Sequence, residues 1–367
     1  LQVFNGQYAD ALTNAENAIL LNPNNAEAHA VRGWAIGMQG NYLDAQTAFN
    51  RAKELNPNLA LAYAYQTEVL VEQINAGEDR LDTLTLATEN SRQAINLGNT
   101  LMETHRARGL LLEITGNYEE AVTEFQIAIA INPNIADLYL ALGRAYRANG
   151  MDTEAITAFE LASTLTPYDP WAPYYISRTY ASNGEYTKAI QQGEDAIELD
   201  PTETQFYWNL GTQYYRSGDY AKALEYFRLS IQGGIGKDGA IVQGIPLSYD
   251  NRVSELYYMY GLILARSGQC QEAAEVVRLG QRVPGRGVAD VAVGVVVFPV
   301  HGVVFRHAVP KAVGQYLVLQ RPLRPPWHVE AGDDPERGGG VGRGHRFRPV
   351  GTRARSEEHT SELQSRL

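Results

Sequence analysis

A unit of 34 residues recurs along most of the chain, and this period constrains the fold more than any other feature of the sequence. Prolines that follow Asn, Asp or Thr mark the unit at Pro23, Pro57, Pro133, Pro167 and Pro201. Most intervals are 34 residues, and the interval of 76 residues between Pro57 and Pro133 corresponds to two units with eight extra residues. A period of this length indicates one supersecondary unit per repeat. Such a unit cannot bury its apolar face alone, so it has to stack on its neighbours.

Small and aromatic residues recur at fixed offsets within the units and indicate a pair of packed helices. We expect the small residues to let two helices approach closely, the aromatic residues to fill the space between them, and the proline to stop the second helix. The marks are a glycine (Gly40, Gly116, Gly150, Gly184, Gly218), a tyrosine (Tyr42, Tyr118, Tyr186, Tyr220), an alanine (Ala45, Ala121, Ala155, Ala189, Ala223), a phenylalanine (Phe49, Phe125, Phe159, Phe227) and a second alanine (Ala52, Ala128, Ala162, Ala196).

This pattern resembles the tetratricopeptide repeat family, whose 34-residue unit reads W-x2-L-G-x2-Y, then A-x3-F, A and P. Its first half is matched by Tyr139, Leu142, Gly143 and Tyr146, by Tyr207, Leu210, Gly211 and Tyr214, and by Tyr257, Tyr260, Gly261 and Leu264. One unit departs from the pattern, because Pro173 stands at its large-aromatic offset and puts the start of that helix in question. The resemblance implies an all-α fold of about seven helix–turn–helix units, stacked into a right-handed superhelical solenoid. We expect the protein to be bacterial.

The repeat marks divide the chain into units. We place a half unit at 6–25, full units at 26–59, 60–101, 102–135, 136–169, 170–203 and 204–232, and a last helix pair at 254–280. We expect residues 6–280 to be almost wholly helical, with no β-sheet. Extra residues around 76–84 are expected to lengthen the helices of their unit or to bulge the connecting loop, and the Gly-rich insert at 233–252 is expected to be an exposed loop.

The end of the chain differs from the repeats in composition and charge. Of the 31 Lys and Arg, 13 lie in residues 281–367, which leaves 18 in the repeats; of the 42 Asp and Glu, 8 lie there, which leaves 34. Residues 281–354 lack helical periodicity, and we expect an out-of-frame or disordered tail. The sequence RSEEHTSELQS at 355–365 resembles a translated sequencing adapter. Because the chain starts with Leu1 and shows no leader, we also expect it to be a fragment.

No group of residues has the spacing of a catalytic or metal site, so we expect neither an enzyme nor a cofactor. His29 and His105 stand at the large-aromatic offset and are expected to pack between helices, and Cys270 is expected to be a small buried residue. The acidic repeats argue against a nucleic-acid partner, because phosphate binding needs basic residues. No apolar run is long enough to span a membrane. The sequence leaves open whether the protein is cytoplasmic or exported.

In the family that the repeats resemble, ligands lie in a concave groove lined by the first helix of each unit. This rule implies a protein-interaction scaffold that binds a peptide or protein segment; the alternative is the regulatory or substrate-docking arm of a larger enzyme or signalling protein. It implies the groove residues Arg144, Arg147, Trp171, Tyr174, Tyr175, Arg178, Trp208, Asn209, Tyr215, Arg216, Tyr258 and Arg266, and, in earlier units, Glu27, Ala30, Trp34, Glu68, Glu72 and Glu113. Aromatic residues and arginines often dominate binding energy, and arginine can hold a carboxylate with two hydrogen bonds. We therefore expect a protein or peptide ligand with apolar anchors and an acidic or C-terminal carboxylate group.

Overall fold

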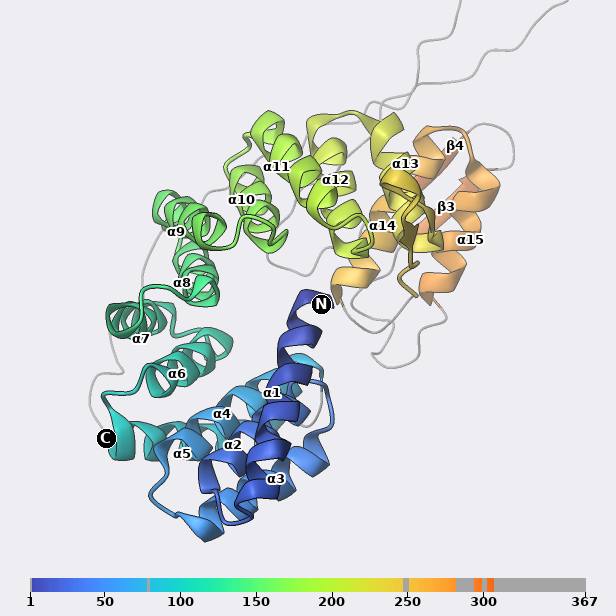
Figure 1. Ribbon diagram of the computed structural model, residues 1–367. Coiled ribbons are helices and arrows are strands. Elements are labelled where there is room, and N and C mark those ends of the chain that lie inside the picture. Colours follow the sequence, from blue (N-terminus) through green and yellow to red (C-terminus); the bar gives the residue numbers. More distant parts are fainter. Residues whose placement is uncertain (1, 78–79, 247–250, 282–293, 299–301, 307–367) are drawn as a thin grey trace, which may run out of the picture. The chain divides into compact units, whose positions relative to one another are not determined.

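The computed structural model describes residues 2–77, 80–246, 251–281, 294–298 and 302–306. In these residues the chain forms fifteen α-helices, which follow one another in packed pairs (Figure 1). They are α1 (Gln2–Leu21), α2 (Ala26–Gly37), α3 (Tyr42–Leu55), α4 (Ala60–Asn75), α5 (Arg80–Gly98), α6 (Met102–Thr115), α7 (Tyr118–Ile131), α8 (Ala136–Ala148), α9 (Asp152–Leu165), α10 (Trp171–Ser182), α11 (Tyr186–Leu199), α12 (Thr204–Ser217), α13 (Tyr220–Gln232), α14 (Asn251–Arg266) and α15 (Cys270–Gln281).

The helices form seven pairs, from α2/α3 to α14/α15, with α1 packed in front of the first pair. Each second helix also packs on the first helix of the next pair, and the first helices of neighbouring pairs contact one another. The predicted all-α solenoid of helix–turn–helix units is therefore confirmed. The first helices of the pairs, which are the even-numbered helices α2 to α14, share one face of the solenoid.

Four of the helix pairs, α2/α3, α6/α7, α8/α9 and α12/α13, are closed by a phenylalanine that packs on a glycine of the partner helix. Phe159 of α9 is fully buried, and a Cβ on Gly143 of α8 would lie 2.4 Å from its ring. The same contact joins Gly109 to Phe125. These contacts confirm that small residues let the paired helices approach and that aromatic residues fill the space between them.

The glycines between the paired helices have a different role from the predicted one. Gly40, Gly116, Gly150, Gly184 and Gly218 all have φ between 76° and 91°, and no atom lies within 4 Å of the position that a Cβ would occupy. They are required because the turn between the helices passes through the left-handed region, which other residues adopt only with strain. The prediction that these glycines permit close helix approach was wrong; the glycines inside the first helices do so.

A polar side chain near the start of the first helix holds the turn that precedes it. The hydroxyls of Tyr63, Tyr139 and Tyr207 donate to the carbonyl of the repeat proline six residues earlier, at 2.8–3.1 Å. Pro173 cannot make this bond. It lies in the first turn of α10, where a missing backbone N–H leaves no helical hydrogen bond unmade, and α10 begins at Trp171 all the same.

The extra residues after Pro57 lengthen the second pair. Helix α4 has 16 residues and α5 has 19, whereas most other helices of the pairs have 12 to 14. Residues 78 and 79 of their connection lie outside the described part of the chain. The prediction of longer helices around 76–84 is thus confirmed.

The insert after α13 contains a small β-hairpin, which corrects the expectation of a wholly helical array. Strands β1 (Gly234–Ile235) and β2 (Ile241–Val242) pair antiparallel around a short 3-10 turn. Val242 is buried against the core of the last pairs, and Thr204 of α12 donates to the carbonyl of Gln243. The expectation of a wholly helical array was wrong at this point. Most described residues of the insert are exposed, and Val242 together with contacts to α12 and α13 anchors it to the array.

Two further strands lie after the last helix. β3 (Gly294–Phe298) and β4 (Gly302–Arg306) form an antiparallel hairpin that the sequence did not predict. The remaining residues of the expected tail, including the adapter-like end, lie outside the described residues. Cys270 also differs from its prediction: it begins α15 and is exposed, because the first residue of a helix projects beyond the packed face.

Candidate functional site

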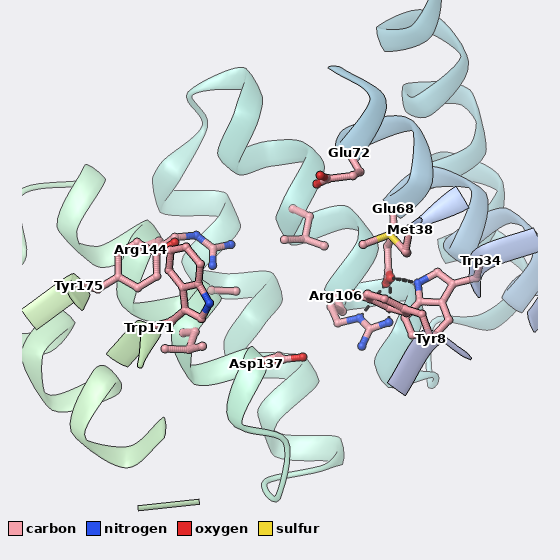
Figure 2. Close-up of a pocket in the computed structure, with 13 residues that line it drawn as sticks. Tyr8, Trp34, Met38, Glu68, Glu72, Arg106, Asp137, Arg144, Trp171 and Tyr175 are labelled. Carbon is pink, nitrogen blue, oxygen red and sulfur yellow. Dashed lines mark hydrogen bonds and ion pairs between the residues drawn. The ribbon is translucent and has the colours of Figure 1, made fainter. Parts of the chain in front are cut away.

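A cavity of about 380 Å³ opens on the face that the first helices share (Figure 2). Its walls come from α1 and from the first helices of five successive pairs, α2, α4, α6, α8 and α10. The lining residues are Tyr8, Trp34, Met38, Glu68, Glu72, Arg106, Leu110, Asp137, Leu140, Ala141, Arg144, Trp171 and Tyr175. We call this site the groove cavity.

A buried ion pair joins three helices at one end of the groove cavity. Glu68 of α4 is 5% exposed and accepts two hydrogen bonds from Arg106 of α6, at 2.7 and 2.8 Å. The indole N–H of Trp34 in α2 donates to the same carboxylate at 2.9 Å. Burial alone would lower the pKa of Arg106, but the charge of Glu68 outweighs it and raises that pKa. Glu68 thus balances the charge of Arg106 within the protein.

A second ion pair links the next two helices. Arg144 of α8 donates two hydrogen bonds to Glu113 of α6, at 2.9 and 3.0 Å. Its guanidinium group also lies 5.8 Å from the centre of the Tyr175 ring, which belongs to α10. Arg144 was predicted as a groove residue, and it does line the cavity. Two of its N–H groups already donate to Glu113.

Aromatic rings form the two ends of the groove cavity. At one end Trp34 packs edge-on against Tyr8 at 5.0 Å and stacks with Tyr65 at 5.3 Å. Burial, together with nearby acidic groups, raises the pKa of Tyr8 to about 12, so its hydroxyl stays protonated at neutral pH. At the other end Trp171 contacts Tyr174, Tyr175 and Phe206, with ring centres 5.2–6.1 Å apart. Figure 2 shows these two clusters facing each other across the cavity.

Two carboxylates of the groove cavity have no ion-pair partner among the described residues. Asp137, in the first turn of α8, lies between the two aromatic clusters, and Glu72 of α4 lies on another wall (Figure 2). Asp137 remains exposed to solvent, yet loss of hydration beside the surrounding protein raises its pKa, and Arg106 and Arg144 offset only part of this effect. The cavity therefore combines aromatic walls with unpaired negative charge.

Two predicted arginines lie beside the cavity without a carboxylate partner in the described chain. Arg147, in the last turn of α8, has a buried Nε with no hydrogen-bond partner. Its neighbour Arg178 of α10 donates to the hydroxyl of Tyr174 at 3.3 Å. Burial lowers the pKa of Arg147, and the positive charge of Arg178 lowers it further. We call Arg147, Tyr174 and Arg178 the arginine pair site.

The other predicted groove residues lie further along the chain. Tyr215 and Tyr258 are half-buried neighbours, and Arg266 lies 4.1 Å from the centre of the Tyr220 ring. Arg216 is exposed at the end of α12. Trp208 is half-buried against the largest core cluster. The structure thus brings Arg144, Trp171 and Tyr175 into the groove cavity and places these five residues outside it.

Asn209 lies in the core rather than on a surface. Its side chain is 8% exposed, donates to Ser177 at 2.9 Å and accepts from Gln213 at 2.9 Å. Among the earlier residues, Trp34, Glu68 and Glu72 line the groove cavity and Glu113 holds Arg144. Ala30 is fully buried and Glu27 is exposed at the start of α2.

Sequence reasoning missed several residues that line the cavity, notably Tyr8, Arg106 and Asp137. The repeat itself held the signal for Asp137, which lies 34 residues before the predicted Trp171 and therefore occupies the same offset. Tyr8 lies in α1, which precedes the first pair and is not a first helix, so the offsets of the first helices did not point to it. Arg106 reaches the cavity because it pairs with Glu68, a contact that depends on the packing of α4 against α6.

Both histidines of the repeats make structural contacts. His29 lies 3.0 Å from the carbonyl of Pro23, and the buried His105 bridges Glu124, at 2.6 Å, and the carbonyl of Asn99. Within the described chain, no three His, Cys, Asp or Glu side chains gather as metal ligands would. No described helix is both long and apolar enough to cross a bilayer.

The comparisons with known proteins address the repeats. A family model described as TPR repeat matches residues 114–150 and 178–218, and two models described as tetratricopeptide repeat match residues 1–60 and 136–169. Among curated proteins, none matches the chain.

Solved structures share the fold at low sequence identity. A tetratricopeptide repeat protein from Parabacteroides merdae is 16% identical with a TM-score of 0.51, over 72% of this chain and 95% of that one. The Cut9–Hcn1 heterotetramer of the APC/C is 12% identical with a TM-score of 0.59, and the match covers 74% of this chain and 49% of that one. The human IFIT1 dimer with PPP-AAAA is 16% identical with a TM-score of 0.52, and the match covers 75% of this chain and 68% of that one. At these identities the likeness concerns the fold alone.

Proposed function

The chain is a tetratricopeptide repeat protein, and we propose that it is a non-catalytic scaffold that binds a segment of a partner protein along the first helices of its pairs. The observation that carries this proposal is the groove cavity, which five successive first helices and α1 build together. Its aromatic side chains offer contact area at little cost in rotamer entropy. Two ion pairs fix neighbouring first helices to one another, so the surface is formed before a ligand arrives.

We further propose that the bound segment carries apolar or aromatic anchors and one carboxylate, from an acidic side chain or a C-terminus. The arginine pair site supports this proposal, because Arg147 and Arg178 lie close together and neither forms an ion pair within the described chain; the charge of Asp152 offsets only part of the effect of burial and of Arg178 on Arg147. Bringing two guanidinium groups together costs electrostatic energy that a bound carboxylate would offset. Arg144 is less suited to this role, since Glu113 already holds it.

Selection from a random peptide library tests the binding function. The full chain is immobilised, peptides displayed on phage are enriched against it, and the dissociation constant of the best peptide is measured. We expect Arg178→Ala combined with Trp171→Ala, which removes an aromatic residue of the groove cavity, to weaken binding of that peptide by roughly 2–4 kcal/mol, as removal of interface hot spots does. The matched control is Arg51→Ala with Tyr168→Ala, which removes an exposed arginine of a second helix and an exposed aromatic ring of a loop.

Two results would contradict the proposal. One is that no peptide is enriched above the level of an unrelated helical protein. The other is that the enriched peptides bind the Arg178 and Trp171 variant as tightly as the parent chain while circular dichroism shows both proteins folded.

A further inference from the structure

We propose that the groove cavity is a subsite for a cationic side chain, so that the bound segment carries a lysine or arginine beside its apolar anchors. This inference rests on the proposed function, because it specifies the ligand of the same groove. It differs from the expectation of a carboxylate ligand, since it concerns Asp137 and Trp171 rather than the arginine pair site.

The charges of the cavity favour a cation. Arg106 and Arg144, the two cations that line it, are each held by two hydrogen bonds to a glutamate. What remains within the described chain is the negative charge of Asp137 and Glu72, for which no ion pair forms. A ligand with a positive group would therefore meet carboxylates without an ion-pair partner rather than compete with an existing pair.

A second acidic residue lies near Asp137. Asp169, just before α10, is close enough for the negative charge of Asp137 to add to the burial that raises its pKa. Its carboxylate accepts a hydrogen bond from the backbone N–H of Trp171 at 2.9 Å, which fixes it at the start of α10. Two acidic groups thus converge near Trp171, and a cation placed between them would relieve their repulsion.

The aromatic wall offers a surface that suits such a cation. Arg106 already lies over the ring of Trp34 and Arg144 over that of Tyr175, at 5.9 and 5.8 Å. Trp171, by contrast, has other aromatic rings as its ring partners, and no cation of the described chain lies over it. Indole is the aromatic group that attracts cations most strongly. Figure 2 shows Trp171 and Asp137 bordering the same cavity, as a cation held by both would require.

The charge of the whole repeat array agrees with a basic ligand. Residues 1–280 hold 34 acidic and 18 basic side chains. Such an excess attracts basic segments from a distance and slows the approach of acidic ones. One segment can also reach the arginine pair site, because Asp137 and Arg147 are ten residues apart on α8, or about 15 Å along a helix.

The test compares peptide selections on the parent chain and on Asp137→Asn. The probe is a phage library of random octapeptides, and the control is Asp10→Asn, an exposed aspartate of α1 that does not line the cavity. We expect peptides from the parent and from the control to be enriched in lysine or arginine at one position. We expect Asp137→Asn to lose this enrichment while it keeps the enrichment in aromatic residues.

A double-mutant cycle then measures the coupling between the basic residue of the peptide and Asp137. The best selected octapeptide and its analogue with norleucine in place of the basic residue are titrated against the parent and against Asp137→Asn. The norleucine change should weaken binding to the parent roughly fivefold to tenfold and should have little effect on Asp137→Asn. Added salt should reduce the first difference, because it screens the charge interaction.

The outcomes separate this inference from the proposed function. Groove-dependent peptides without a basic residue, or equal losses for norleucine in both proteins, would overturn the cation subsite and leave the scaffold function standing. Failure of the parent chain to enrich any peptide would overturn both.

Discussion

Gly143 lies under the ring of Phe159 at a distance that leaves no room for a Cβ, whereas Gly150 in the turn after α8 has open space around it and a φ of 76°. One glycine is therefore required by packing and the other by backbone conformation. Both recur every 34 residues, so a sequence pattern cannot tell them apart. This is why the turn glycines were assigned the wrong role: a positive φ leaves no trace in residue identity beyond glycine itself.

The buried phenylalanine allows a direct test of the register of the pairs. Phe159→Ala removes a fully buried ring between α8 and α9, and we expect the free energy of unfolding to fall by about 3–5 kcal/mol. Urea denaturation measures this loss. Glu160→Ala, on the exposed neighbour, should change stability by only a few tenths of a kcal/mol. A loss for Phe159→Ala well below 3 kcal/mol would mean that the ring is not packed as described.

Lys53 provides a pH test at the residue scale. It lies between Gln66, Asn90 and the ring of Tyr63, and burial lowers its pKa to about 8. An unfolded lysine keeps its proton up to about pH 10.4, so between about pH 8 and 10 the unfolded chain binds more protons at this position. Stability contributed by this position must then rise with pH in that window.

The measurement compares the parent with Lys53→Met. The urea midpoint of the parent relative to that variant should be higher at pH 9.5 than at pH 7.5. A difference that stays constant, or that falls as the pH increases, would show that the ammonium group is not buried as the structure has it.

At the scale of elements, the insert between α13 and α14 shows how side chains of the repeat hold a segment that is not part of it. Tyr207 donates its hydroxyl proton to Pro201, as the equivalent tyrosines do, but its oxygen also accepts the backbone N–H of Lys237 in the insert. The hydroxyl of Tyr257 donates to the carbonyl of Ile245. These bonds join residues that are 12 to 30 positions apart, so local patterns of two-residue strands could not predict the hairpin.

Tyr207→Phe tests this anchoring. Loss of the hydroxyl removes the acceptor of the Lys237 amide, and we expect its hydrogen exchange to accelerate about fivefold, in line with a net hydrogen-bond contribution of about 1 kcal/mol. Tyr139→Phe is the matched control, because Tyr139 bonds only the turn before α8. Unchanged exchange at Lys237 in the Tyr207 variant would show that the hydroxyl does not hold the insert.

At the scale of the whole molecule, the period of the sequence predicted the stacked pairs well and the binding surface in part. Offsets placed Trp34, Glu68 and Arg144 on one face, and they do line one cavity. Offsets could not show that Arg144 is held by Glu113, since that pair depends on how far α8 stands from α6. Asn209 shows the opposite error: its offset faces the groove in general, but Ser177 and Gln213 give it partners inside the core.

The array should not depend on the residues after its last pair. In a repeat protein each pair contacts mainly its neighbours, so stability is close to a sum of local terms. We therefore expect a chain that ends at Gln281 to keep the thermal midpoint and the helical content per residue of the array, apart from fraying of α15. Circular dichroism measures both. A cooperative loss of the whole array would show that later residues belong to the folded structure.

The central claim is that the first helices of the pairs form a binding surface for a polypeptide segment. Hydrogen exchange of the full chain, with and without a saturating amount of the best library-selected peptide, tests it most directly. We expect protection to increase in α6, α8 and α10, around Arg106, Asp137 and Arg178, while the second helices α7, α9 and α11 change little. Protection confined to those second helices would contradict the claim.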